Sequence, residues 1–258
     1  MNKSFDLAGK TAVITGAAGG IGTELVKFLA AQGASIAALD LRSVAYCAEI
    51  EADFGVRCIT MPCDLTKPEE IKPVITDIAA QLGKIDILVN NAGIYAGLKM
   101  LPFYEQDGDV WDSIYNVNVK GTWQITSAVM PFMIAQKSGS VINISSSSIL
   151  QGVPGLCHYV ASKGAVWAMT RSMANDVGAF GVRVNSVSPG YTMTAASVSL
   201  GGTPEGIAKN NQRNIDDRSI QREMTATDVC GAVGFLACDA SGFITGQNIN
   251  VDGGSVHY

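Results

Sequence analysis

Tyr159 and Lys163 have side chains and a spacing that suit proton transfer. They lie four positions apart in a stretch, 159–166, that is predicted to be helical, so both side chains project from one face. An ammonium group stabilises a nearby phenolate, and at ~4 Å with an effective dielectric of about 20 the attraction is about 4 kcal/mol. We therefore expect the pKa of Tyr159 to lie below the tyrosine reference of about 10, within reach of acid–base catalysis. Taken alone, such a pair can also be a coincidence on a helix surface.

A glycine-rich segment, 15–22, follows a β-branched run and leads directly into an amphipathic helical stretch. Glycines at Gly16, Gly20 and Gly22 let the backbone turn tightly and approach a pyrophosphate, while the helix start supplies N–H donors. The same composition could simply connect a strand to a helix. Asp40 favours the binding interpretation, because it ends the second predicted strand, where a carboxylate can accept hydrogen bonds from both ribose hydroxyls of an adenosine.

Asp40 also predicts which dinucleotide binds. A carboxylate there would lie close to the 2′-phosphate of NADP, and like charges repel, so NAD is the expected cofactor. Ala17 and Ala18 provide no cation in the glycine turn, and Leu41 provides none directly after Asp40. Arg42 is the one nearby cation that could favour NADP. We interpret it as a solvated surface residue, with some use of NADP left open.

The elements that must position these residues alternate between short β-branched runs and longer helical stretches. Several strands are apolar almost throughout, which is typical of strands covered by helices on both faces. The sequence therefore predicts an α/β fold, a Rossmann-like doubly wound seven-stranded parallel sheet with helices on both faces, in a single domain over 1–258. The expected strands are 11–15, 35–40, 57–62, 85–90, 140–145, 182–187 and 247–251.

One segment, at about 195–221, has poor strand and helix signals, and such insertions are often lids over a site. Four cations and four carboxylates lie in and beside it, so a solvated lid with internal ion pairs and a lid that receives an anionic substrate both stay open. These charged residues are Lys209, Arg213, Arg218, Arg222, Glu205, Asp216, Asp217 and Glu223.

The composition argues against several kinds of partner. With 47% hydrophobic and 16% charged residues, the chain is predicted to be globular and not disordered. A net charge of −5 without a polybasic run speaks against nucleic acid and anionic membranes. The six cysteines form no Cys-x-x-Cys pair and only two histidines occur, so no metal site is expected. Neither a signal peptide nor a membrane span is expected, and reduced thiols suit a cytoplasmic enzyme.

Five ordered motifs resemble those of the short-chain dehydrogenase/reductase superfamily, and the similarity covers nearly the whole chain. The family's serine typically lies thirteen positions before its tyrosine, which selects Ser146 and leaves Ser145, Ser147 and Ser148 as close alternatives. The motifs are the glycine turn 15–22, Asn90-Asn91-Ala92-Gly93, Asn118 within 116–121, Ser146, and the Tyr159/Lys163 pair.

The resemblance implies roles for four residues. Tyr159 would exchange a proton with the substrate oxygen, Ser146 would polarise that oxygen, and Lys163 would bind the nicotinamide ribose and favour the phenolate. Asn118 would hold a water that relays the proton outward. The implied function is an NAD-dependent oxidoreductase that transfers hydride between a secondary alcohol and NAD, reversibly to ketone reduction.

The resemblance also implies a set of cofactor contacts. Some have a plainer explanation, since Asp64 could cap a helix, Asn91 could stabilise a turn, and 189–190 could be only a loop. The expected contacts, besides Tyr159 and Lys163, are Gly16, Gly20, Ile21, Gly22, Asp40, Asp64, Leu65, Asn91, Ala92, Gly93, Pro189, Gly190, Thr192 and Thr194.

A substrate pocket of mixed polarity is expected beside these residues. It suits a medium-sized secondary alcohol or ketone, either an aryl or cyclic alcohol or a polyol. His158 could be a second acid or base, but neighbouring helix positions point about 100° apart, so a packing or wall histidine is favoured. The expected pocket residues are Tyr95, Ser148, His158, Tyr191 and Met193, together with Ile94, Leu150 and Leu156.

Two alternative functions stay open. A 3-oxoacyl-carrier reductase is the nearest enzyme alternative, but such enzymes normally prefer NADP and offer a basic patch to an acidic carrier, which Asp40 and the net charge oppose. A non-catalytic NAD-binding sensor is opposed by the intact set of four candidate catalytic residues. By resemblance, we expect a homotetramer that packs helices at about 107–136 and 159–178.

Overall fold

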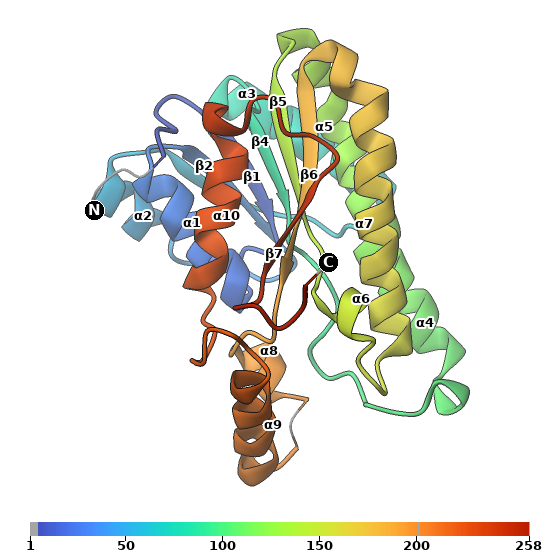
Figure 1. Cartoon of the computed structure of the whole chain (residues 1–258). Coiled ribbons are helices and arrows are strands. Elements are labelled where there is room, and N and C mark those ends of the chain that lie inside the picture. The colour runs from blue at the N-terminus through green and yellow to red at the C-terminus, as the bar shows by residue number, and fades with distance from the viewer. Residues whose placement is uncertain (1–4, 201, 258) are drawn as a thin grey trace.

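The computed structural model describes residues 5–200 and 202–257. Its centre is a seven-stranded sheet in the order β3-β2-β1-β4-β5-β6-β7, and every neighbouring pair is parallel (Figure 1). The Rossmann-like α/β fold expected from the sequence is therefore confirmed. The strands are β1 (Thr11–Thr15), β2 (Ser35–Asp40), β3 (Cys58–Pro62), β4 (Ile87–Asn90), β5 (Gly139–Ile144), β6 (Val182–Pro189) and β7 (Asn248–Val251).

Helices cover both faces of this sheet. On one face, α1 (Gly20–Ala31), α2 (Cys47–Phe54) and α10 (Thr227–Ala237) share one buried cluster with the strands. On the other face, α3 (Pro68–Leu82), α5 (Thr122–Gln136) and α7 (Cys157–Val177) share a second cluster. Because both faces are buried, consecutive apolar residues occur in the central strands, as at Ile87, Leu88 and Val89 of β4.

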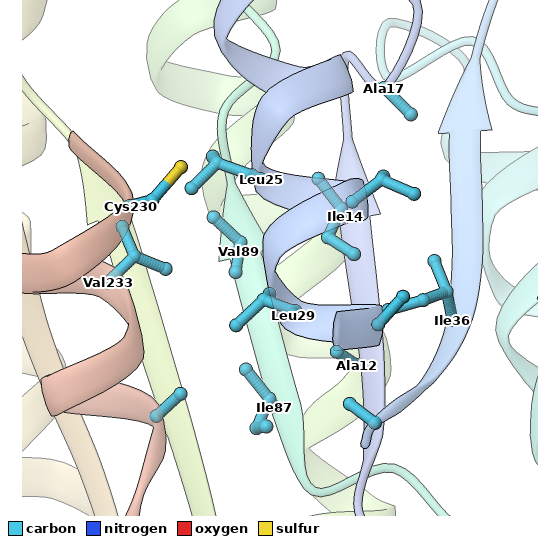
Figure 2. Packing of buried hydrophobic residues seen from close by; sticks show 14 of the residues in the cluster. Ala12, Ile14, Ala17, Leu25, Leu29, Ile36, Ile87, Val89, Cys230 and Val233 are labelled. Atoms are coloured by element: carbon cyan, nitrogen blue, oxygen red, sulfur yellow. The ribbon is translucent and has the colours of Figure 1, made fainter. Parts of the chain in front are cut away.

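The two clusters follow from the alternation of side chains along each strand. In β1, Ala12 and Ile14 belong to the first cluster and Val13 to the second. Figure 2 shows Leu25 and Leu29, which lie four positions apart on one face of α1, packed over the first of these faces. Burying a leucine side chain in this way contributes about 1.5–3 kcal/mol.

Three features of the chain differ from the sequence expectation or refine it. Helix α4 (Gly108–Tyr115) joins α5 through a π-helical turn, Asn116–Gly121, and does not form one regular helix with it. The expected irregular segment at 195–221 instead contains α8 (Ala195–Val198) and α9 (Pro204–Asp216). A short helix, α6 (Ser148–Gln151), follows β5.

Local signals explain why α9 forms. The Thr203 hydroxyl accepts a hydrogen bond from the Gly206 N–H, and Pro204 occupies the first helical turn, where its missing N–H costs nothing. Asparagine and glutamine residues give the helix a weak apolar pattern, so periodicity alone fails to reveal it. Helices α8 and α9 project beyond the ends of the strands (Figure 1).

The described residues show neither a membrane-spanning helix nor a cluster of metal ligands. Within residues 5–200 and 202–257, no helix combines the length and apolar character that crossing a bilayer requires. The same residues bring together no group of three or more histidine, cysteine or acidic side chains that could hold a metal.

Candidate active site

A cavity of about 700 Å³ lies where the carboxyl ends of the strands meet. Strand β1 pairs with β2 on one side and β4 on the other, so the chain reverses its direction across the sheet at this point. Ligands of open α/β sheets bind outside such a switch point. The volume is within the usual range for a small-molecule or cofactor site.

The glycine turn between β1 and α1 forms one wall of the cavity. Gly16 has φ +67°, and a Cβ there would lie 2.8 Å from the Cα of Ala92. A Cβ on Gly22 would lie 2.1 Å from the Gly16 carbonyl oxygen. Within the described chain no side chain caps the start of α1, which leaves backbone N–H groups for a phosphate. Because the glycines have no side chains, the pyrophosphate of a dinucleotide can approach the backbone closely here.

Asp40 lies at the end of β2 with its carboxylate against the glycine turn. One oxygen accepts a hydrogen bond from the Ala18 N–H at 2.9 Å, and the other accepts one from the Arg42 N–H at 2.9 Å. The oxygen that accepts from Ala18 keeps a further lone pair for a ribose hydroxyl, whereas the other also accepts from the Arg42 Nε. The Arg42 side chain is 68% exposed, and its Nε lies 3.4 Å from Asp40, so it is paired as well as solvated.

Asn91 and Asp64 stabilise turns and also line the cavity. The Asn91 amide donates to the carbonyl oxygens of Thr15 and Gly16, both at 3.0 Å, and so fixes the glycine turn. Asp64 accepts hydrogen bonds from the Thr66 hydroxyl and N–H, and these bonds lower the pKa of its carboxyl group. Both residues therefore have the structural roles considered above. Both also lie where the cofactor contacts are expected.

Tyr159 and Lys163 line the cavity from α7, and Ser146 lines it from the loop after β5. Burial raises the pKa of Tyr159, and a side-chain hydrogen bond with Ser146 partly opposes this effect. The Ser145 hydroxyl instead donates to the carbonyl oxygen of Lys163 at 2.9 Å. Of these two serines, Ser146 is thus the one that contacts the candidate acid–base residue.

The electrostatics of Tyr159 and Lys163 differ from the sequence expectation. Burial raises the pKa of Tyr159 to about 12 and lowers the pKa of Lys163 to about 8. The Lys163 ammonium donates to the Ile144 carbonyl oxygen at 2.8 Å and lies 5.9 Å from the centroid of the tyrosine ring. Desolvation therefore outweighs the attraction between the two side chains.

Asn118 lies in the π-helical turn, behind the cavity wall, and is 1% exposed. Its side-chain oxygen accepts from the Ile94 N–H at 2.7 Å, and its amide donates to the Ser162 hydroxyl at 3.1 Å. Through Asn118, these bonds hold the loop after β4 in place relative to α7. Both polar groups of the side chain thus have protein partners, and the water-holding role that the resemblance implies stays a prediction.

Comparison with known proteins places this site in a family. The family model described as enoyl-(acyl carrier protein) reductase matches residues 16–256. A 3-oxoacyl-(acyl-carrier-protein) reductase of Thermotoga maritima is 35% identical over 252 residues, which are 97% of this chain and 99% of the relative. The chain belongs to the short-chain dehydrogenase/reductase superfamily. The resemblance drawn from the sequence motifs is thereby confirmed.

Solved structures of this superfamily share the whole fold. An NAD⁺-bound xylitol dehydrogenase has a TM-score of 0.87 at 31% identity, with 98% of this chain and 100% of that chain covered. A gluconate 5-dehydrogenase of Burkholderia cenocepacia, in complex with NADP and tartrate, has a TM-score of 0.89 at 31% identity, with 97% and 96% covered. The chain is accordingly an oxidoreductase of a superfamily that uses NAD or NADP.

The substrate end of the cavity contains three of the five expected side chains. Tyr95, Ser148 and Tyr191 line it, while His158 and Met193 lie outside the lining. His158 is 2% exposed, its ring packs against Trp111, and its Nδ1 accepts a hydrogen bond from the Tyr159 N–H. Inclusion of His158 in the pocket is thus corrected in favour of the packing interpretation, because its ring faces α4.

Sequence reasoning missed several lining residues. Met100 and Val153 belong to loops without a recognised motif, and Asn210 and Asn214 were covered only by the broad lid segment. The two asparagines lie four positions apart on α9, so recognition of the Thr203 cap could have placed them on one face.

Proposed function

We propose that this superfamily member is an NAD-dependent dehydrogenase that interconverts a small secondary alcohol and the corresponding ketone. One observation carries the proposal: Ser146, Tyr159 and Lys163 line the same cavity as the glycine turn and Asp40. A non-catalytic sensor would need only the glycine turn and the carboxylate. The shared cavity therefore supports catalysis over simple binding.

The chain's own groups supply binding and proton transfer. Gly16, Gly22 and Asp40 would hold the pyrophosphate and adenosine of NAD, which supplies a hydride acceptor when bound. Ser146 donates a hydrogen bond to the substrate oxygen and fixes its position. For oxidation, the Tyr159 phenolate accepts the hydroxyl proton; for reduction, the Tyr159 phenol donates it back. The Lys163 ammonium would bind the nicotinamide ribose and favour the phenolate.

Asp40→Ala is expected to raise the NADP/NAD ratio of kcat/KM. The change removes both the acceptors for the ribose hydroxyls and the charge that repels a 2′-phosphate, and it frees Arg42 from its ion pair. The wild type should prefer NAD by at least about tenfold, or about 1.4 kcal/mol. Steady-state kinetics with both cofactors measure the ratio. Equal use of NADP by the wild type would contradict the cofactor assignment.

A 3-oxoacyl-carrier reductase is the second candidate, and the similarity to the Thermotoga maritima enzyme supports it more directly than it supports a free alcohol. The surface charge, in contrast, favours a free alcohol over a carrier-bound substrate. Four exposed carboxylates, Glu105, Asp107, Asp109 and Asp112, lie in and just before α4, near the 97–106 loop that contributes Met100 to the cavity. Such a surface repels an acidic carrier protein.

One comparison of substrates separates the two candidates. The wild type is assayed for NAD reduction with secondary alcohols and polyols, and for NADH and NADPH oxidation with a 3-oxoacyl thioester on its carrier protein. We expect kcat/KM to be higher with NAD and an alcohol. Higher kcat/KM for the carrier-bound thioester would establish the second candidate, and no turnover in either direction would remove both.

A further inference from the structure

A buried arginine lies where three segments of the chain meet, near the carboxyl ends of β6 and β7. Arg218 follows α9 and is 4% exposed. Its guanidinium donates hydrogen bonds to the carbonyl oxygens of Tyr191, which follows β6, and of Arg222, which precedes α10. A Cβ on Gly253, after β7, would lie 3.2 Å from the Arg218 Cδ, so the arginine stem packs against that glycine. One side chain therefore connects all three segments.

The loop 189–194, which contains Tyr191, borders the catalytic end of the cavity. The N–H of Ser147, the residue after Ser146, donates to the Pro189 carbonyl oxygen at 2.9 Å. Strand β6 lies on the other side of β1 from β2, which carries Asp40. The loop is therefore beside the candidate catalytic residues and away from the adenosine end. Its cavity-lining residues are Pro189, Gly190, Tyr191, Thr192 and Thr194.

Arg218 holds the middle of this loop. On either side of Tyr191, the N–H groups of Gly190 and Met193 donate to main-chain carbonyl oxygens of β7 and of the segment before α10, at 2.8 and 3.0 Å. Between these two bonds, the Tyr191 carbonyl oxygen accepts from the Arg218 guanidinium. Loss of the guanidinium would leave this carbonyl oxygen without its donor, and the loop would have to change its path to find another.

The charge of Arg218 strengthens these contacts. Hydrogen bonds from a charged donor are about twice as strong as neutral ones, and a buried charge is tolerated where such bonds are made. The buried carboxylate of Asp252 interacts electrostatically with Arg218. A Cβ on Gly190 would lie 2.9 Å from the Asp252 Cα, so this acidic residue packs against the same loop. Arg218 lies outside the cavity lining, which favours the paired lid over an anion-receiving one.

We propose that Arg218 is a positioning residue for the nicotinamide half of the dinucleotide. It acts through the Tyr191 carbonyl oxygen and fixes the path of the loop 189–194, which would contact that half of NAD. The adenosine half would be bound by the glycine turn and Asp40, which Arg218 does not touch. A loop that is not held in place must be ordered when the ligand binds, and this ordering weakens binding. The inference rests on the proposed NAD-dependent function and adds to it a residue outside the cavity.

The test compares a whole dinucleotide with its adenosine half. Dissociation constants of NADH and AMP are measured by calorimetric titration for the full-length wild type and for Arg218→Met, which keeps an unbranched stem and removes the guanidinium. AMP carries one phosphate and no nicotinamide, so it needs the glycine turn and Asp40 but not the loop. In Arg218→Met we expect NADH to bind about five- to tenfold more weakly, because one charge-assisted hydrogen bond no longer holds the loop. AMP should bind within about twofold of the wild type.

Two further variants separate positioning from charge and from stability. Arg218→Lys keeps the charge but lacks the planar fork that reaches two carbonyl oxygens at once, so its NADH affinity should lie between those of the wild type and Arg218→Met. Arg213→Met is the matched control, because the Arg213 side chain on α9 is 81% exposed and lies outside the cavity lining. It should change neither constant. Should Arg218→Met fail to fold, Arg218→Lys decides, with NADH binding weakened at least about twofold and AMP binding unchanged.

The outcomes separate this inference from the proposed function. Wild-type binding of both ligands, with NADH binding unchanged in the Arg218 variants, overturns the positioning role and keeps the cofactor assignment. Weakening of NADH and AMP by the same factor also overturns it, because a general loss of structure would act on both halves of the cavity. A wild type that binds neither NADH nor AMP overturns the inference together with the function on which it rests.

Discussion

Tyr159→Phe is expected to reduce kcat for alcohol oxidation by about 10²–10⁴-fold, the contribution of general acid–base transfer alone. The change deletes the ionisable oxygen and keeps the ring, which packs against Tyr95 at 4.9 Å between centroids. Stability and NAD affinity should therefore stay close to those of the wild type. Turnover, the unfolding midpoint and the NAD dissociation constant are measured for both proteins.

Tyr104→Phe is the matched control, because Tyr104 is exposed and lies outside the cavity lining. A Tyr159→Phe protein that keeps more than about a tenth of wild-type oxidation would show that another group transfers the proton. His158 is the first alternative acid–base residue that the sequence offers. Its ring packs against Trp111 and its Nδ1 is bonded to the Tyr159 N–H, so the structure offers it no position at the substrate.

Ser146→Ala is expected to lower kcat by about 10²-fold or more with little change in NAD binding. Loss of a hydrogen bond that strengthens in the transition state has this signature. The hydroxyl bonds to Tyr159 and accepts from the Ser148 N–H at 3.2 Å, so its removal acts on the reacting oxygens first. Single-turnover rates and NAD titrations separate the two effects.

The serine neighbours provide a control series. Ser145→Ala removes a buried bond to the Lys163 carbonyl oxygen, so its primary effect should be on stability. If Ser147→Ala were the inactive variant, the assignment of the polarising hydroxyl would be wrong by one residue.

Much of the fold follows from the sequence because its signals are local. Apolar β-branched runs locate all seven strands to within a few residues, and the motif spacing predicts the superfamily that the comparisons confirm. The strand edges shift, as at β4, which begins at Ile87 and not at 85. The sequence did not predict helix α9, because the residues after its cap, Thr203, are mostly polar and show little apolar periodicity.

The site residues themselves stay predictions, although the structure brings most of them to one cavity. What the sequence misjudged depends on side-chain direction and burial, which spacing does not report. The Lys163 ammonium points to the Ile144 carbonyl oxygen, and burial moves the pKa of Tyr159 upward, opposite to the attraction estimated from helical spacing.

The dependence of kcat/KM for alcohol oxidation on pH tests the proposed proton transfer most directly. Tyr159 and Lys163 form one buried pair, so their protons leave in two steps that belong to the pair. The first loss, from the pair with phenol and ammonium, gives a species that can hold the phenolate beside the ammonium. Because burial lowers the pKa of Lys163 to about 8 and raises that of Tyr159 to about 12, the first step should lie near the lower value.

Oxidation should therefore rise with pH through an apparent pKa below 10. Ketone reduction starts from the fully protonated pair, with phenol and ammonium, and should fall through the same value. The measurement is a pH profile of kcat/KM in both directions for the wild type and Tyr159→Phe. We expect the rise in the wild type and its absence from the residual activity of Tyr159→Phe. The same rise in the Tyr159→Phe protein would contradict Tyr159 as the base.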